Sequence, residues 1–329
     1  MHVRMRLSFL VIPILWAVFG FSVSASEHQI RIGVALQPSS ALIIIALENG
    51  YLSAEGLEID VKTYPSGKRA LLDGLFTGDV DLVSASDAPI VFNSFARQDF
   101  SVIASIFSAD NFNRVIARRD RGIAKPADLR GKRVATQKAS AVHFFLHLFL
   151  LENGMSEKDV QLSFMKAGKL PGALARGDID AFSMREPFIS QAAQLLGQDN
   201  AVIFAEPGLY DQSDQVVVLN KTLKEKPDAI RRFLKALARA ENFLINNTRK
   251  AVGILAKVTK GDRASLETGL SESRYKLELT QSLFLRLEDE ARWVIDAKLT
   301  RHQTMPNFLR FIDTAPLKAV RPDAVTIIK

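Results

Sequence analysis

The sequence predicts an α/β protein with two lobes, each a mostly parallel sheet flanked by helices, and a helical C-terminal third. Short β-branched segments alternate with longer helical ones, polar caps bound the helices, and two segments resemble passages between lobes. We expect strands at Arg31–Leu36, Glu58–Tyr64, Asp81–Ser86, Val102–Phe107, Arg133–Gln137, Gln161–Met165, Ala181–Met184, Val202–Ala205 and Gln215–Leu219.

Capping residues mark the predicted helices. Ser39-Ser40 precedes the apolar run 41–48, and Asn49-Gly50 follows it, which is a polar N-cap and a left-handed C-cap. Asn153-Gly154 closes the helix that follows the strand at 133–137 in the same way. Pro227 begins a helix of regular apolar spacing, and from there to about Asn307 we expect nearly all helix.

The N-terminus has the pattern of a secretory leader. Arg4 and Arg6 precede an apolar block at 7–21, and small residues end at Ala25, where we expect cleavage. The block is shorter than the about 20 residues that cross a bilayer. The chain has no cysteine, hence no disulfide and no lipid-anchoring cysteine. An exported chain of this kind suggests the periplasm. Loss of Arg4 and Arg6 with the leader lowers the net charge from +7 to +5, which is too mild to indicate nucleic-acid binding.

Two passages divide the exported chain into lobes. The first lies at 113–125 and the second at 211–221, with one αβ group between them. This describes a discontinuous first lobe with an inserted second lobe. We therefore expect a signal peptide at 1–25, the first part of lobe 1 at 26–114, lobe 2 at 115–213, and a return to lobe 1 at 214–329.

Small and polar residues recur where a strand is followed by a helix. At such turns the first N–H groups of the helix lack intrahelical partners, and the helix dipole favours negative charge. The carboxyl ends of parallel strands are also where ligands bind. We therefore expect ligand-binding residues at three turns: Ser39 and Ser40, then Ser86 and Asp87, then Lys138, Ser140 and Ala141.

His143 and His147 stand four residues apart on the helix after the third turn. Phe144 occupies the position where a zinc-peptidase helix has glutamate, and no further histidine or acidic cluster lies nearby in sequence. We expect no metal site. His143 remains a candidate ligand contact because it lies in the first turn of its helix, close to Ser140.

Arg185-Glu186-Pro187 follows the strand at 181–184, again at a carboxyl edge. Arg185 would suit a sulfonate or carboxylate, and Glu186 would accept from an amine or ring N–H. Neighbouring residues of an extended chain point to opposite sides, so at most one of the two should face a ligand. The sequence leaves open which one.

Seven motifs in order and spacing give the chain a family resemblance between Ile30 and about Leu219. It resembles the periplasmic substrate-binding proteins of ABC importers, in the group that serves nitrate, taurine, aliphatic sulfonates and pyrimidine precursors of thiamine. The motifs are ENGYL at 48–52, AEGLEI at 54–59, LFTGDVDL at 75–82, SDAP at 86–89, KPADLRGKRVA at 125–135, ALARGDIDAF at 173–182 and EPF at 186–188.

The resemblance implies two type II binding-protein lobes that close on a ligand around a hinge. It favours Ser39, Ser40, Ser86, Asp87, Ser140, Ala141 and Glu186 as ligand contacts. The third turn lacks the glycine that sulfonate binders tend to have, and Arg185 stands where many relatives place tryptophan. These departures bear on the ligand and leave the fold unaffected.

The function expected from the resemblance is the solute-binding component of an ABC import system, with a membrane permease and ATPase as partners. A sulfonate or taurine-like anion is the first choice of ligand, and a thiamine-type pyrimidine or other nitrogen heterocycle is the alternative. A module that presents its ligand to a membrane sensor would need the same cleft. We expect no enzyme and no cofactor, because no nucleophile, base and orienting carboxylate stand in a recognisable order. The fungal thiamine-pyrimidine synthase of this fold carries a cysteine-rich motif that this chain lacks.

Overall fold

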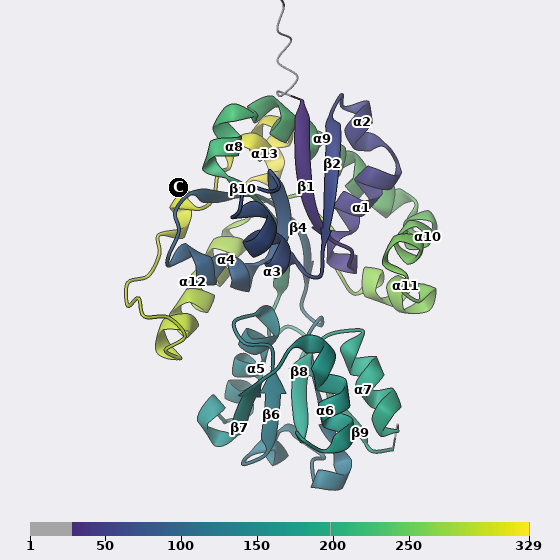
Figure 1. Ribbon diagram of the computed structural model, residues 1–329, viewed down its shortest axis with the longest axis vertical. Helices are drawn as coiled ribbons and strands as arrows, with labels where there is room; N and C mark the ends of the chain where they lie inside the picture. Colours follow the sequence, from purple (N-terminus) through teal and green to yellow (C-terminus); the bar gives the residue numbers. More distant parts are fainter. Residues whose placement is uncertain (1–27, 198, 329) are drawn as a thin grey trace, which may run out of the picture.

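The computed structural model describes residues 28–197 and 199–328, so the predicted leader and its cleavage after Ala25 lie outside the described residues. Two lobes, each with its own sheet, are stacked along the long axis of the molecule (Figure 1). This arrangement confirms the predicted α/β class with two mostly parallel sheets. Among the described residues, no helix combines the length and apolarity that crossing a bilayer requires.

Each sheet has five strands with the same arrangement. The first lobe has the order β2 (Glu58–Tyr64), β1 (Gln29–Ala35), β3 (Leu82–Ser86), β10 (Gln212–Leu219) and β4 (Phe100–Ala109). The second has the order β7 (Gln161–Phe164), β6 (Arg133–Thr136), β8 (Ala181–Met184), β5 (Arg114–Arg118) and β9 (Ala201–Phe204). In both sheets three parallel strands are followed by an antiparallel fourth, β10 or β5, that pairs on both sides.

These two antiparallel strands are the first elements after each passage between the lobes. The chain leaves β4 and enters the second sheet through β5, and it leaves β9 and re-enters the first sheet through β10. The sequence interpretation treated 114–118 as part of a passage, but these residues form a central strand of the second sheet. It also began the returning strand at Gln215, three residues later than the structure does.

Helices cover both faces of the sheets, and the C-terminal third is mainly helical (Figure 1). The first lobe contains α1 (Ala41–Glu48), α2 (Tyr51–Ala54), α3 (Gly67–Arg69), α4 (Asp87–Ser94), α8 (Asn220–Glu225), α9 (Pro227–Asn246), α10 (Thr248–Thr259), α11 (Arg263–Ser271), α12 (Gln281–Asp296) and α13 (Ala315–Val320). The second contains α5 (Ala141–Glu152), α6 (Leu170–Arg176) and α7 (Phe188–Leu196).

The predicted helix boundaries are right at the N-terminal side and less accurate near the C-terminus. Gly50 and Gly154 adopt φ angles of 66° and 67°, so both predicted glycine stops are left-handed. The expected helix up to Asn307 is wrong in detail. Residues 274–279 are not helical, with Arg274 and Glu278 forming isolated bridges to β4, and α12 ends at Asp296, near the left-handed Lys298.

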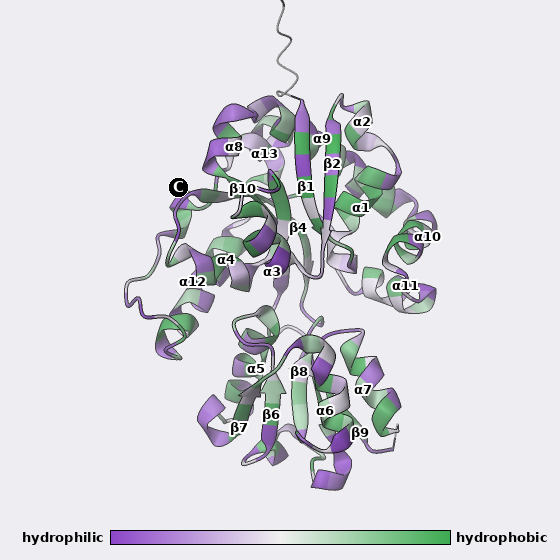
Figure 2. Ribbon diagram, in the orientation of Figure 1, coloured by the Kyte–Doolittle hydropathy of each residue, from purple (hydrophilic) through white to green (hydrophobic). Residues whose placement is uncertain are grey.

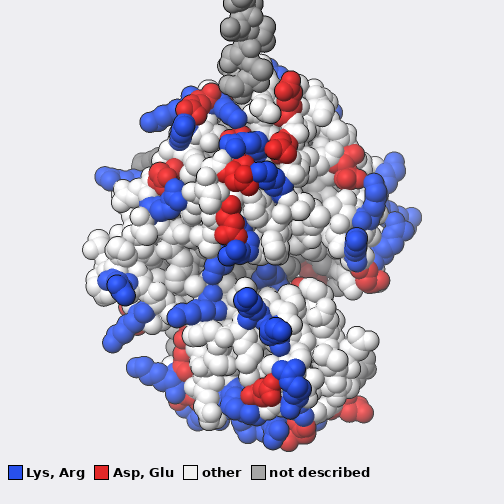
Figure 3. Space-filling view, viewed as in Figure 1, with Lys and Arg blue, Asp and Glu red and all other residues white. Residues whose placement is uncertain are grey.

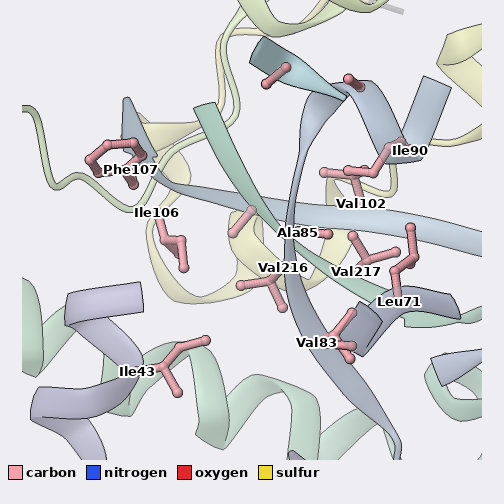
Figure 4. Close-up of a cluster of buried hydrophobic side chains, with 14 of the residues drawn as sticks. Ile43, Leu71, Val83, Ala85, Ile90, Val102, Ile106, Phe107, Val216 and Val217 are labelled. Carbon is pink, nitrogen blue, oxygen red and sulfur yellow. The ribbon is translucent and has the colours of Figure 1, made fainter. Parts of the chain in front are cut away.

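Apolar side chains from both faces of the first sheet form the main core. Figure 4 shows Ile43 of α1 together with strand residues such as Val83, Ile106 and Val216. Residues 41–46 of α1 are all buried, which explains why this helix is apolar all round. Hydropathy alternates more clearly on the outer helices, where polar residues face solvent (Figure 2).

The motif Gly-Asp-x-Asp has the same structural role in both lobes. In the first lobe, Asp81 accepts from the backbone N–H of Arg31 at 2.9 Å and from its Nη2 at 2.8 Å. In the second, Asp180 accepts from the N–H of Arg133 at 3.0 Å and from its Nη2 at 2.6 Å. Each aspartate thereby connects the residue before one strand, β3 or β8, to the neighbouring strand, β1 or β6.

We predict that Asp81→Asn lowers the free energy of unfolding by roughly 3 kcal/mol, because Asp81 is buried and also accepts from Lys226 Nζ at 2.9 Å. Burial raises the pKa of Asp81, but the hydrogen bonds from Arg31 and Lys226 outweigh it and hold the pKa below its usual value. The stability from this carboxylate is therefore present above its unfolded pKa and is lost as pH falls. Urea unfolding at pH 7 measures the loss.

The matched control for this prediction is Asp79→Asn. Asp79 belongs to the same motif, but its side chain is 46% exposed and pairs with Lys62 at the surface. The control should leave the unfolding midpoint nearly unchanged. Equal effects of the two substitutions would contradict the structural role given to Asp81.

Candidate functional site

The strand-to-helix turns of the two lobes meet where the chain crosses between the sheets. The crossing segments are 110–113 after β4 and 205–211 after β9. Lys68 of α3 donates to the backbone oxygen of Ala139 at 3.1 Å, so the first lobe touches the third predicted turn. Burial lowers the pKa of Lys68. The surface is hollowed between the lobes, and Lys and Arg side chains gather on both sides of the hollow (Figure 3).

The first turn contributes two buried serines. Ser39 Oγ donates to Asp214 Oδ2 at 2.6 Å, and Ser40 Oγ lies 3.2 Å from Ser84 Oγ. Both serines are almost fully buried. In this conformation their hydroxyls contact groups of the first lobe, and Ser39 connects the turn to β10.

The second turn holds Ser86 and Asp87 in different environments. Ser86 is half-buried and precedes α4 without capping it through its side chain. Asp87 is fully buried: Oδ1 accepts from Tyr210 Oη at 2.6 Å, and Oδ2 accepts from the N–H of Ser213 at 3.2 Å. Arg286 Nε lies 3.3 Å from Oδ2. Both oxygens of Asp87 therefore already bind groups of the protein. This predicted ligand acceptor lies beneath the second crossing segment.

The third turn opens α5 with a mixture of buried and exposed residues. Ser140 Oγ donates to the backbone oxygen of Gln137, and Ala141 is buried behind it. Lys138 is exposed, with Nζ 5.3 Å from the centre of the Phe164 ring. Ala139 has a φ of 54°, a left-handed conformation that few non-glycine residues adopt.

The two histidines on α5 share one carboxylate. His143 Nε2 and His147 Nδ1 lie 3.4 and 3.5 Å from Glu157 Oε1. Burial raises the pKa of Glu157, but the two histidines outweigh this and bring it to about 2. Sequence reasoning missed Glu157 because it follows the end of α5 and folds back onto it. Within the described chain, no cluster of three His, Asp or Glu side chains has the geometry of a metal site.

These histidines also form an inter-lobe contact. The rings of His143 and His147 lie 5.0 and 5.9 Å from Trp293 of α12, and Phe144 lies 5.1 Å from it. Because α5 belongs to the second lobe and α12 to the first, Trp293 packs between the lobes. His143 itself is fully buried.

Arg185 and Glu186 point to different surroundings, as alternation predicts. Glu186 is exposed, and its Oε2 accepts from the N–H of Ser190 at 3.1 Å, so it stabilises the first turn of α7. Arg185 lies over Phe112 of the first crossing segment at 5.7 Å. Burial lowers the pKa of Arg185, against the opposing influence of Asp214 and Tyr210. Its guanidinium makes no hydrogen bond or ion pair with any residue in 28–197 or 199–328.

The structure adds acidic and polar residues that sequence reasoning missed. Asp214 on β10 is buried beside Ser39, and burial raises its pKa to about 6, against the influence of Ser39 and Arg185. Glu290 and Arg286 come from α12, which the sequence suggested was only structural. The run of polar residues at 211–215 that leads into an apolar strand is the signal for Asp214, and no local pattern marks Glu290.

A groove of about 500 Å³ runs along the junction of the lobes near the second crossing segment. Phe144 and His147 of α5 line one side, and Arg286 and Trp293 of α12 line the other. Tyr210 lies at its base. The groove therefore lies at the joint between the lobes, and not at the predicted ligand-binding turns.

Comparison with known proteins places the chain in a family. The NMT1/THI5-like family matches residues 37–251. A binding protein of Brucella abortus (strain 2308) is 26% identical over 266 residues, covering 80% of this chain and 81% of that protein. The taurine-binding periplasmic protein of Escherichia coli (strain K12) is 24% identical over 235 residues, covering 68% and 70%.

A solved structure shows the same fold. The alkanesulfonate-binding protein SsuA from Xanthomonas axonopodis pv. citri, bound to MOPS, superposes with a TM-score of 0.73 over 87% of this chain and 98% of that one. Its sequence identity of 21% establishes the architecture alone. Because the family matches well over half of the chain, including the second lobe, both crossing segments and much of the first lobe, the chain belongs to the NMT1/THI5-like family.

Proposed function

We propose that the protein is the periplasmic solute-binding component of an ABC import system and holds a small organic anion between its lobes. A sulfonate, in particular a taurine-like one, is the proposed ligand. The observation that carries this proposal is Arg185, a half-buried side chain beside the crossing segments whose guanidinium has no hydrogen-bonding partner among the described residues. A charge in such surroundings is costly until an anion neutralises it.

Asp214 supports a ligand with an amine as well as an anionic group. Its carboxylate lies close enough to Arg185 for the two charges to influence each other's pKa, yet they form no ion pair within 4 Å. A zwitterion such as taurine would offer its sulfonate to Arg185 and its ammonium to Asp214. Ser39, which donates to Asp214, would hold that carboxylate in place.

We assign the remaining predicted residues to the surroundings of Arg185 and Asp214. Ser40, Ser86, Lys138, Ser140, Ala141 and His143 lie on the turns at the lobe junction, and we propose that opening and closing of the lobes exposes their polar groups to the ligand. A ligand that contacts both lobes only in the closed form drives closure by its differential affinity for that form. Binding without turnover is expected, as for the binding proteins that the family contains.

The pyrimidine alternative depends on acceptors rather than on Arg185. Glu186 is exposed and accepts a hydrogen bond from the first turn of α7, and both oxygens of Asp87 accept hydrogen bonds from the protein. Asp214 is therefore the remaining acceptor for a ring N–H. One acceptor is weaker support for a pyrimidine ligand than the unpaired Arg185 guanidinium is for an anionic ligand. A ligand-presenting role toward a membrane sensor would use the same residues and differs only in its partner.

A thermal-shift screen of residues 26–329, refolded once to remove carried ligand, tests the proposal. Taurine at 100 times its dissociation constant should stabilise the protein by about 2.7 kcal/mol. Ethanesulfonate, which lacks the amine, should give a smaller shift if Asp214 contacts the ammonium. A shift with aminopyrimidines alone would favour the alternative, and no shift with any sulfonate, carboxylate or nitrate would contradict the anion proposal.

Closure can be followed by intrinsic fluorescence. The chain has two tryptophans, Trp16 in the predicted leader and Trp293, so the chain from residue 26 onward has Trp293 alone. Trp293 packs against the α5 histidines of the other lobe. Its emission therefore reports changes at the lobe junction on ligand addition.

A further inference from the structure

A buried cluster of two carboxyl groups and a phenol lies at the joint between the lobes, and the proposed ligand contacts do not use it. Tyr210 Oη lies 2.6 Å from Asp87 Oδ1 and 2.8 Å from Glu290 Oε1. Both carboxyl groups are fully buried, and Tyr210 is nearly so. Tyr210 belongs to the second crossing segment, Asp87 begins α4, and Glu290 lies on α12.

The two short contacts require a second proton in the cluster. A phenol has one proton and can donate to only one carboxylate. If both carboxyl groups were ionised, the other contact would bring two oxygens within 2.8 Å without a hydrogen between them. One carboxyl group must therefore be protonated and donate to the Tyr210 oxygen.

The surrounding charges assign that proton to Glu290. Arg286 Nε lies 3.3 Å from Asp87, which stabilises Asp87 as the anion. The second oxygen of Glu290 has no hydrogen-bond partner among the described residues. Burial, followed by the charge of Asp87, raises the pKa of Glu290 well above its usual value, in agreement with the geometry.

The same cluster fastens the crossing segment to the first lobe. Arg286 Nη2 donates to Ser213 Oγ at 2.7 Å, and its Nη1 contacts Asp211 at 3.2 Å. On the other side, the ring of Phe144 from the second lobe packs perpendicular to the Tyr210 ring at 5.1 Å. Tyr210 is thus held by the Asp87 carboxylate and the protonated Glu290 on one lobe and by an apolar contact on the other.

We propose that the proton shared by Asp87, Tyr210 and Glu290 holds the second crossing segment against the first lobe, and that its loss at higher pH loosens the joint. The lobes of the ligand-free protein then sample more open arrangements. Besides Arg286, the charged or titratable groups near the cluster include Asp211 and Asp214 on the chain that follows Tyr210, His147 across the groove, and Arg185 of the second lobe, whose charge interacts with Tyr210. This inference concerns the joint and does not depend on the identity of the ligand.

The sign of the pH effect follows from proton counting. Between the unfolded pKa of Glu290 and its raised folded value, the folded protein binds one more proton than the unfolded chain. The stability due to Glu290 is therefore present at low pH and is lost as pH rises. A single proton changes the folding equilibrium constant by up to about tenfold per pH unit in that window.

The test compares ligand-free wild type and Glu290→Gln, both as residues 26–329, between pH 5 and 9. Glutamine keeps a donor for the Tyr210 oxygen but cannot lose it. Urea unfolding should show wild-type stability falling with pH relative to the variant, and small-angle X-ray scattering should show a radius of gyration that increases with pH in wild type alone. Glu241→Gln, a buried carboxyl of the same lobe that contacts Arg321, should keep the wild-type increase in radius.

Two results would overturn the inference. If wild type and Glu290→Gln have the same pH dependence of stability, the shared proton does not exist. If stability differs but the radius of gyration changes equally in both, the proton does not act on the joint. Should Glu290→Gln fail to fold, Tyr210→Phe removes the bridging hydroxyl and should likewise abolish the pH-dependent change in radius.

Discussion

Replacing Arg185 by alanine should reduce the affinity for the sulfonate ligand by roughly 100-fold, which corresponds to about 3 kcal/mol. The side chain is a half-buried cation that lies over Phe112 of the first crossing segment, and its guanidinium has no hydrogen-bonded partner in the described chain. A charge-assisted contact in such a site contributes more than one in water. Calorimetric titration with taurine measures the loss.

The same substitution should leave the ligand-free protein as stable as wild type or more stable. Removing an unpaired guanidinium from half-buried surroundings removes a desolvation cost that the ligand would otherwise offset. Arg185→Lys should give an intermediate affinity, because an ammonium keeps the charge but loses bidentate geometry. The control Arg176→Ala, on an exposed side chain of the same lobe, should bind like wild type. Equal affinities of Arg185→Ala and wild type would contradict this role.

Replacing Asp87 by alanine should lower the free energy of unfolding by roughly 3 to 5 kcal/mol, since it leaves Arg286, Tyr210 and the Ser213 N–H without their buried partner. For a protein of this size, the melting temperature should fall by roughly 10 °C. Differential scanning calorimetry at pH 7 measures it.

Ser86→Ala is the matched control, because Ser86 precedes Asp87 but its side chain makes no capping hydrogen bond. It should change stability little. If instead Asp87→Ala melts like wild type but loses ligand binding, Asp87 acts on the ligand, as the sequence suggested, and the structural role described above is wrong.

The predictable part of the fold is the part with local signals. Caps such as Asn49-Gly50 and the alternation of strand and helix segments locate most elements of both lobes. Strand β5, in contrast, was interpreted as a passage, because the charged residues Arg114 and Arg118 flank only three apolar ones. Its place inside the second sheet comes from pairing with β8 and β9, which lie far away in sequence.

The sequence could predict which turns carry polar residues, but not which residues those side chains contact. The sequence indicated Asp87 as a polar residue at a strand end, and its partners lie 123 and 126 residues away, on the second crossing segment and β10. Glu290 follows a helical pattern like that of any amphipathic helix. Which polar residues are buried together depends on how the lobes pack, and no local pattern records that.

Isothermal titration calorimetry of taurine into the ligand-free chain 26–329 tests the central claim most directly. Wild type should show saturable binding at one ligand per protein with a micromolar or lower dissociation constant, and Arg185→Ala should bind taurine roughly 100-fold more weakly. Saturable binding that is the same in both proteins, or no binding by the wild type to taurine and to other small organic anions in its place, would contradict it.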